Sequence, residues 1–156
     1  MSDWISPGSK APAFTLVADD GTKVRLAELT GNTVVLYFYP KDDTPGCTRE
    51  ACAFRDQQAA LNKLGAKVFG ISPDDVASHE KFRDKYRLNF PLLADPDHKM
   101  AEKYGAWREK NMYGKKSLGI QRCTYIIDAS GKVAKLWKRV KVDGHDEQVL
   151  AAIAGL

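Results

Sequence analysis

The sequence predicts an α/β fold with a central mixed β-sheet flanked by helices. Two observations carry this prediction. Apolar segments of strand length alternate with amphipathic segments of helix length, which is typical of parallel strands joined by right-handed crossovers. A hairpin pattern precedes this alternation and another follows it, so antiparallel strands are expected at the sheet edges. The 156 residues, 44% hydrophobic and 28% charged, are typical of a globular chain, and we expect one domain over 1–156.

The amino-terminal part of the chain contains a hairpin and a buried strand. Residues 13–18 and 22–26 flank an Asp-Asp-Gly turn at 19–21, and Asp-Gly between apolar alternations is a strong turn signal. Residues 33–39 form a continuous β-branched and aromatic run. Such a run is expected of a strand that is buried on both faces.

A helix is expected at 47–64, after a polar turn at 41–46. Gly65 follows it and is a natural stop for a helix. The apolar residues of this segment fall at helical spacings and form one face, which comprises Ala51, Phe54, Leu61 and Leu64.

The remaining elements continue the alternation and then close the chain with a second hairpin. They are a strand at 66–72, a helix at 73–87, a strand at 90–94, a helix at 97–104, paired strands at 123–128 and 132–140, and a helix at 144–153. A thioredoxin-like fold with an N-terminal β-hairpin satisfies this order of elements.

Charge and hydropathy argue against two classes of partner. The chain has 24 Lys and Arg against 20 Asp and Glu, and the resulting charge of +4 is dispersed. A nucleic-acid partner is not expected, because phosphate binding needs a basic stripe. The longest apolar run, 34–39, has six residues. A membrane-spanning helix needs about 20, so no membrane segment is expected.

The three cysteines are the first place to look for chemistry. An odd number of cysteines, in a chain with no secretory signal at its amino end, indicates a reducing and therefore cytoplasmic location. In that setting, the thiols that matter are catalytic, redox-sensing or metal-bound.

Cys47 has the position that a reactive thiol needs. It opens the expected helix directly after the buried strand, so it lies where ligands bind in an open α/β sheet. The unpaired N–H groups and partial positive charge of a helix amino terminus favour a thiolate over a thiol. The alternative is a packed structural cysteine, because free cysteine is among the most buried residue types.

The residues around Cys47 resemble those of a known family. Residues 40–52 are Pro-Lys-Asp-Asp-Thr-Pro-Gly-Cys-Thr-Arg-Glu-Ala-Cys. They resemble the peroxidatic motif of peroxiredoxins, Pro-x-x-x-Thr-x-x-Cys, in the form found in the subfamily called bacterioferritin comigratory protein or peroxiredoxin Q. The resemblance covers nearly the whole chain, and its further segments are Phe14-Thr-Leu, 34–40, 105–110, 112–115, 119–122 and 125–128.

The resemblance implies a thiol peroxidase that reduces hydrogen peroxide and organic hydroperoxides without a metal or an organic cofactor. Attack on a peroxide needs a thiolate, hydrogen-bond donors along the O–O axis and shielding from water. Cys47 would supply the thiolate, and the Thr44 hydroxyl would hydrogen-bond both the sulfur and the peroxide. By resemblance, Arg122 would hold the sulfur and a peroxide oxygen together. Pro40 would wall the pocket without offering a competing N–H.

Glu50, one turn into the expected helix, has two interpretations. It could orient Arg122 or a second arginine, or it could be an ordinary glutamate on the helix surface.

Cys52 resembles the resolving thiol of peroxiredoxin Q proteins, a cysteine five residues after the peroxidatic one. Condensation of such a thiol with a sulfenic acid on Cys47 gives a disulfide. Five residues of intact helix rise about 7.5 Å and turn about 140°. That separation exceeds the roughly 7 Å between α-carbons that a disulfide tolerates, so the first turns of the helix must unwind.

Cys123 departs from the family pattern, in which Ser or Thr commonly follows the arginine. We expect a buried and inert thiol there, with an alternative resolving or regulatory role left open. The resemblance further implies recycling by thioredoxin or glutaredoxin, and a monomer.

Three rival functions use the same residues. A thioredoxin-like disulfide reductase needs Cys-x-x-Cys, whereas this chain has Cys-x-x-x-x-Cys. A metal module would combine the two cysteines with one of the histidines, but the spacings do not fit and each histidine is expected on a charged, solvated segment: His79, His98 or His145. A redox sensor or holdase that signals through the Cys47–Cys52 disulfide needs the same activated thiol, so the sequence does not separate it from a peroxidase.

Overall fold

The strand β3 (Thr33–Phe38) lies in the middle of the sheet because its β-branched and aromatic run can be buried on both faces. Its residues from Val34 onward are all buried. The structure is a computed structural model that describes residues 3–156. In it, β3 pairs in parallel with β4 (Ala66–Ser72) and antiparallel with β8 (Cys123–Ile127).

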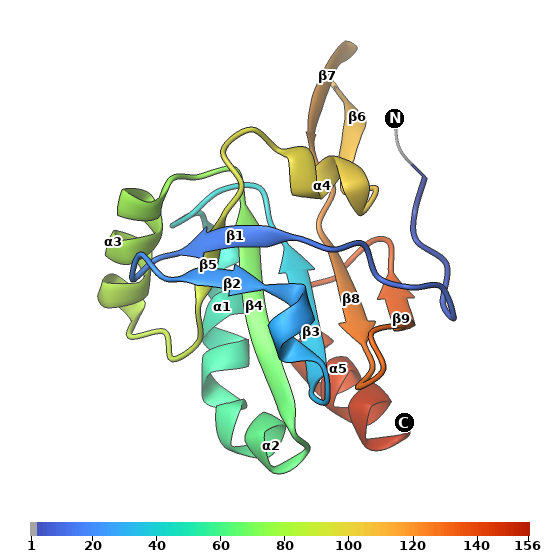
Figure 1. The fold of residues 1–156 in the computed structure, drawn as a ribbon. Coiled ribbons are helices and arrows are strands. Elements are labelled where there is room, and N and C mark those ends of the chain that lie inside the picture. Colours follow the sequence, from blue (N-terminus) through green and yellow to red (C-terminus); the bar gives the residue numbers. More distant parts are fainter. Residues whose placement is uncertain (1–2) are drawn as a thin grey trace.

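Figure 1 shows the seven-stranded sheet, whose strand order is β2-β1-β5-β4-β3-β8-β9. The strand β5 (Leu92–Ala94) continues the parallel centre beside β4. One edge is the hairpin of β1 (Thr15–Ala18) and β2 (Lys23–Arg25), and the other edge is β9 (Val133–Trp137), which pairs antiparallel with β8. The predicted mixed sheet with an N-terminal hairpin is therefore confirmed.

Helices cover the two faces of the sheet unequally. One face carries α1 (Pro45–Asp56), α2 (Gln58–Lys63), α3 (Val76–Tyr86) and α5 (His145–Ala154). The other carries α4 (Lys99–Lys103) and a 3-10 helix, η1 (Leu26–Leu29). Side chains alternate along β3 between the two cores. Val35 and Tyr37 belong to the core under α1, and Leu36 and Phe38 belong to the core under α4.

The helix expected at 47–64 is two helices, so that expectation was wrong. The chain turns at Gln57, which ends α1 and precedes α2. The polar run at 56–58 offers no apolar face to continue one straight helix, and the turn lets Leu61 become fully buried. Leu64, expected on the same apolar face, caps α2 and is 39% exposed.

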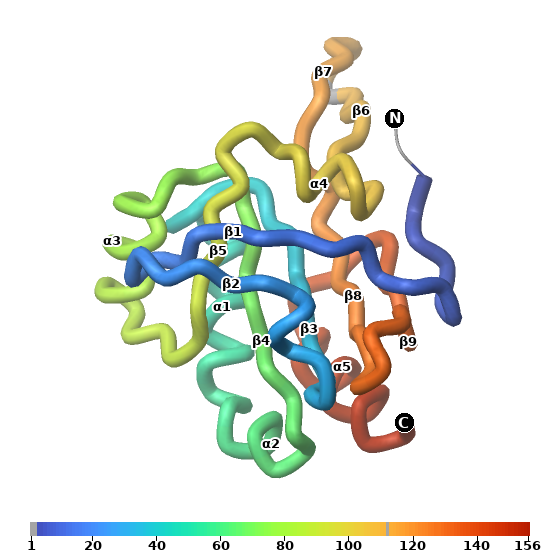
Figure 2. The backbone as a smooth tube through the Cα atoms, viewed as in Figure 1, coloured from blue at the N-terminus to red at the C-terminus, as the bar shows by residue number. Residues whose placement is uncertain are grey.

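A further hairpin, made of β6 (Trp107–Met112) and β7 (Lys115–Ile120), was not expected from the sequence. It forms its own two-stranded sheet and projects from the body of the molecule (Figures 1 and 2). Its turn is Tyr113-Gly114, and both residues have positive φ angles, 54° and 79°. The hairpin lacks the apolar alternation that would have predicted it.

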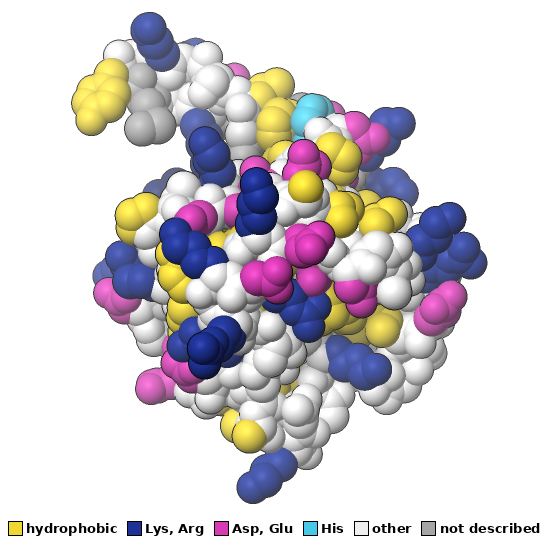
Figure 3. All heavy atoms as spheres, turned by 90° about the vertical axis from the view of Figure 1, so that its left-hand side faces the viewer, with side chains coloured by type: hydrophobic (Ala, Val, Ile, Leu, Met, Phe, Trp, Pro, Cys, Tyr) yellow, Lys and Arg dark blue, Asp and Glu magenta, His cyan; other side chains and the backbone are white. Residues whose placement is uncertain are grey.

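Charge is spread over the surface. The face in Figure 3 carries basic and acidic side chains side by side, in keeping with the dispersed charge of the sequence. Among the described residues, no helix has the length and apolar character needed to cross a bilayer.

Candidate active site

The structure places Cys47 in the first turn of α1, beyond the carboxyl end of β3, as the sequence predicts. A short turn, 40–44, joins the two elements. Thr44 is the N-cap residue of α1, and Pro45 opens the helix, where its missing N–H is no loss. Cys47 is 1% exposed and therefore shielded from bulk water.

Arg122 lies beside Cys47, although the two are 75 residues apart in the sequence. One guanidinium nitrogen, Nη2, donates to Cys47 Sγ at 3.2 Å. The other, Nη1, donates to Glu50 Oε1 at 2.7 Å. A Cβ atom on Gly46 would lie 3.3 Å from Arg122 Nη2, so the glycine leaves the room that this guanidinium occupies. The planar fork of arginine thus links the sulfur to a carboxylate.

Glu50 is the orienting partner of Arg122, so the first of its two interpretations fits the structure. Its side chain is 1% exposed, and within the described part of the chain Oε2 has no hydrogen-bond partner. Burial raises the pKa of Glu50 to about 7, and the neighbouring Arg122 only partly offsets that effect. The site therefore contains a carboxyl group that titrates near neutral pH.

Thr44 and Pro40 are close to Cys47 in the chain. The Thr44 hydroxyl donates to the Lys41 carbonyl oxygen at 2.9 Å and does not cap α1. The hydroxyl proton of Thr44 is used in this bond, and the lone pairs of its oxygen can still accept a hydrogen bond. Pro40 is exposed at the start of the turn. The roles expected for these two residues in peroxide reduction stay predictions.

All three cysteines are free thiols in this structure. Cys52 is half-buried on α1, which is intact from Pro45 to Asp56. The helix therefore separates Cys47 from Cys52 by a rise of about 7.5 Å. A disulfide between them requires α1 to unwind.

Cys123 lies in β8 and is fully buried. Burial raises the pKa of its thiol well above the ordinary value. The predicted buried thiol is confirmed, and a neutral thiol in this place is a poor nucleophile.

The expectation that the histidines lie on solvated segments was wrong for two of them. His79 is fully buried and His145 is 1% exposed. The nitrogens of His79 face Asp42 and the Leu93 carbonyl, and those of His145 face Thr124 and Gln148. Both imidazoles are thus bonded within the fold rather than beside a cysteine.

One residue near the site was not singled out from the sequence. Lys110, on β6, lies along Gly119 of the neighbouring strand, with its Cδ 3.5 Å from where a Cβ of the glycine would be. Burial and then the charge of Arg122 lower the pKa of Lys110, while Cys47 opposes this shift. The unexpected hairpin therefore brings a further cation toward the thiol.

Comparison with known proteins gives a consistent result. Residues 7–136 match the AhpC/TSA family. The chain is 45% identical to peroxiredoxin Bcp of Bacillus subtilis over 149 residues, which cover 96% of this chain and 95% of that protein.

Solved structures agree with this match. A structure of the Xanthomonas campestris bacterioferritin comigratory protein, described for its alkyl peroxide reduction activity, superposes with a TM-score of 0.88 at 42% identity, covering 91% of this chain and 90% of that one. A structure of Xylella fastidiosa PrxQ superposes with a TM-score of 0.93 at 32% identity, covering 99% and 98%. The predicted thioredoxin-like peroxiredoxin fold is confirmed.

Proposed function

The chain belongs to the AhpC/TSA family and is a peroxiredoxin of the Bcp or peroxiredoxin Q type, and on that premise we propose that Cys47 is the nucleophile that reduces its peroxides. The observation that carries this proposal is the Arg122 guanidinium, which contacts Cys47 Sγ and Glu50 Oε1 together. A fixed cation beside a buried sulfur stabilises the thiolate. It also stabilises negative charge that develops on a peroxide oxygen.

The reaction begins with in-line attack of the Cys47 thiolate on one oxygen of the peroxide. A sulfur–oxygen bond forms, the O–O bond breaks, and the electron pair leaves on the second oxygen, which takes a proton and departs as water or an alcohol. Cys47 becomes a sulfenic acid. The Thr44 lone pairs would accept the O–H of the incoming hydroperoxide, and Pro40 would bound the pocket.

Cys52 then resolves the sulfenic acid. Its thiolate attacks the Cys47 sulfur, the sulfur–oxygen bond breaks, and the oxygen leaves as hydroxide, which takes up a proton to give water, so the product is a disulfide. Support comes from the position of Cys52 on the same helix and from the weak start of α1, where no side chain caps the helix. A poorly capped helix end opens at low free-energy cost.

An external dithiol closes the cycle. We propose thioredoxin or glutaredoxin as the reductant, hydrogen peroxide and organic hydroperoxides as substrates, and a monomer acting in the cytoplasm as one domain over 1–156. The odd number of cysteines supports a reducing compartment. The alkyl peroxide activity named for the Xanthomonas campestris relative supports organic substrates.

A redox sensor or holdase that uses the Cys47–Cys52 disulfide remains the alternative function. It is favoured by the same pair of thiols, Cys47 and Cys52, and by the same uncapped helix α1. Catalysis and signalling differ in stoichiometry, because an enzyme consumes many equivalents of peroxide and a sensor consumes one.

The decisive experiment measures peroxide consumption coupled to thioredoxin for the wild type and for single Cys→Ser variants. We expect Cys47→Ser to be inactive, Cys123→Ser to retain activity, and Cys52→Ser to complete one oxidation without recycling. Activity retained in Cys47→Ser would contradict the nucleophile assignment. Recycling lost in Cys123→Ser, but kept in Cys52→Ser, would contradict the resolving assignment.

A further inference from the structure

The turn 40–44 that leads into α1 is tied to the body of the protein through one buried carboxylate, Asp42. Its side chain is only 8% exposed. Oδ1 accepts a hydrogen bond from the Tyr39 hydroxyl at 2.6 Å, and Oδ2 accepts one from the Ser78 hydroxyl at 2.8 Å. Its backbone N–H donates to Asp74 Oδ2 at 2.7 Å. The turn is therefore bonded to the residue that follows β3, to α3 and to the segment that follows β4.

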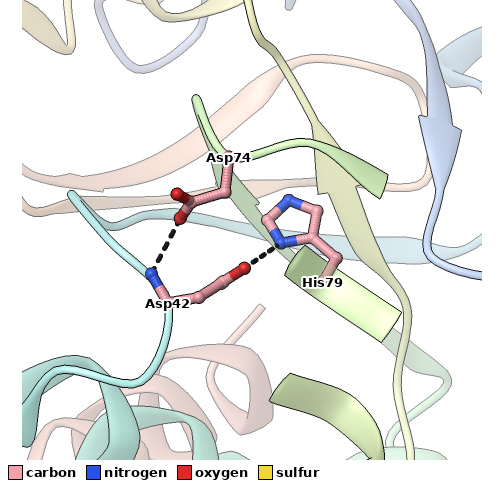
Figure 4. Close-up of side chains that lie close together, drawn as sticks. All are labelled: Asp42, Asp74 and His79. Atoms are coloured by element: carbon pink, nitrogen blue, oxygen red, sulfur yellow. Dashed lines mark hydrogen bonds and ion pairs between the residues drawn. The ribbon is translucent and has the colours of Figure 1, made fainter. Parts of the chain in front are cut away.

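A further bond joins Asp42 to His79 of α3, with 2.7 Å between Oδ2 and Nδ1 (Figure 4). His79 has no exposed surface, and its Nε2 lies 3.0 Å from the Leu93 carbonyl oxygen. Because a carbonyl oxygen only accepts, Nε2 must carry a proton. The imidazole thus spans the space between the turn and β5, and each of its nitrogens has a partner.

These bonds also account for a cluster that would otherwise suggest a metal site. Ligand atoms of Asp42, Asp74 and His79 all lie within 4.8 Å of one another. Their polar atoms already bond to each other, to the backbone or to hydroxyl groups. The cluster is therefore a hydrogen-bond network, and its function depends on the segment that it holds in place.

What the network holds is the start of the active-site helix. Thr44, two residues after Asp42, is the N-cap residue of α1, and its carbonyl oxygen accepts from the Thr48 N–H at 2.8 Å. Cys47 lies inside this first turn. Any displacement of Asp42 is passed to Thr44 and then to Cys47, whose contact with Arg122 depends on the place of the helix end.

We propose that Asp42 and His79 form a positioning pair that fixes the turn 40–44 and thereby sets the reactivity of Cys47 toward peroxide. This inference rests on the proposed role of Cys47 and deepens it. Neither residue touches the sulfur, so the pair acts through Thr44 and the first turn of α1. A displacement of about 1 Å at a reacting centre can cost about 100-fold in rate.

The test compares two rates for the same thiol, both measured on the reduced full-length protein. One is oxidation of Cys47 by hydrogen peroxide. The other is alkylation of Cys47 by iodoacetamide, which needs the thiolate but no groups that hold a peroxide oxygen. Asp42→Ala and His79→Leu should each lower the ratio of peroxide to iodoacetamide rates by about tenfold or more. The double variant should be no worse than the poorer single variant, because the two side chains act as one unit.

A conservative variant and a matched control separate positioning from general damage. In Asp42→Asn the amide can donate to Nδ1 of a neutral His79, so the ratio should recover to within about threefold of wild type. Asp43 lies in the same turn and also bonds α3, through Lys85 Nζ at 2.7 Å and the Tyr86 hydroxyl at 2.6 Å, but it is exposed. Asp43→Asn should leave the ratio within about twofold, because Asn tolerates the positive φ of this residue, 58°, and the loss of an exposed ion pair has little effect.

Two outcomes would overturn the proposal. One is a wild-type ratio in Asp42→Ala and His79→Leu variants whose circular dichroism is native. The other is an equal loss in Asp43→Asn. If the two main variants do not fold, His79→Gln can still donate to the Leu93 carbonyl oxygen but lacks the Nδ1 contact with Asp42, and a wild-type ratio in this variant would equally overturn the proposal. Cys47→Ser in the same assay tests the proposed nucleophile separately. If Cys47 is the nucleophile, this variant has no peroxide rate to compare, and a peroxide rate kept in Cys47→Ser would contradict the role of Cys47 rather than that of the Asp42–His79 pair.

Discussion

The helices α1 and α3 lie on the same face of the sheet and begin beyond the carboxyl ends of two neighbouring parallel strands, yet they are built differently. At the start of α3, Asp75 caps the helix by accepting from the Ser78 N–H at 2.8 Å. At the start of α1, the Thr44 hydroxyl donates backward to Lys41, and no side chain caps the helix. The amino end of α3 is thus capped by a side chain, and the amino end of α1 is not.

The two helices also differ in whether their buried polar side chains have all their hydrogen-bond partners. In α3, His79 has partners for both nitrogens. In α1, Glu50 is buried with one carboxylate oxygen unpartnered among the described residues. Burying an unsatisfied polar group costs free energy, so α1 is held less firmly than α3. The proposed disulfide between Cys47 and Cys52 requires α1 to unwind, and this weakness would lower the cost of that step, whereas α3 would stay in place.

The largest effect in this comparison should come from Arg122, the cation that bonds both the Cys47 sulfur and the Glu50 carboxyl group of α1. Arg122→Met should lower the second-order rate of Cys47 oxidation by about 100- to 1,000-fold, because a donor aimed at developing charge is lost. Stopped-flow measurement with hydrogen peroxide gives this rate. Arg49→Met is the matched control, because Arg49 is an exposed cation of the same helix that faces Asp143 at 3.7 Å. Equal losses in both variants would contradict the account.

The next effect concerns the buried carboxyl group of α1 and depends on pH. Because burial raises the pKa of Glu50 to about 7 from 4.5, the native protein keeps a proton that the unfolded chain releases between these values. Wild-type stability should therefore fall as pH rises through this window. Glu50→Gln cannot titrate, so its stability relative to wild type should rise by about 2 to 3 kcal/mol between about pH 4.5 and pH 8.

Urea unfolding of the reduced proteins at both pH values measures this change. Glu147→Gln, an exposed change in α5, serves as the control, and its stability should follow the wild-type pH curve because this variant keeps Glu50. Parallel pH curves for wild type and Glu50→Gln would contradict the raised pKa of Glu50.

The smallest effect should come from the cap of α3. Asp75→Ala should lower the free energy of unfolding by about 1 kcal/mol, because the Ser78 N–H loses its acceptor. The rate of Cys47 oxidation should stay within about twofold of wild type, since the cap lies outside the active site. Denaturant unfolding and stopped-flow kinetics on the same sample check both values. A large fall in rate with no fall in stability would show that α3 takes part in the chemistry directly.

The sequence alone predicted those parts of the molecule that have a local signal. Strand β3 was recognised from its unbroken apolar run, and the place of Cys47 followed from the strand and turn before it. The hairpin of β6 and β7 was missed because its residues are mostly charged and polar, so no alternation marks it. The break at Gln57 was missed because the polar run at 56–58 could equally lie on the exposed face of one continuous helix.

Burial of charged groups was the other limit of the sequence. Glu50 and His79 lie on segments rich in charged residues. Pairing with Arg122 was one of two interpretations of Glu50, and His79 was expected on a solvated segment, yet both are buried. Each is buried because a partner far away in the chain meets it, Arg122 in one case and Asp42 in the other. Such pairs depend on the tertiary fold, so spacing along the chain does not predict them.

The central claim is that α1 unwinds so that Cys52 can resolve Cys47 while α3 stays folded. Hydrogen exchange with peptide mapping, on wild-type protein before and after one equivalent of hydrogen peroxide, tests it most directly. The account predicts a Cys47–Cys52 disulfide, faster exchange over 45–56, and unchanged exchange over 76–86. A disulfide to Cys123, or a Cys47–Cys52 disulfide formed with α1 still protected, would contradict it.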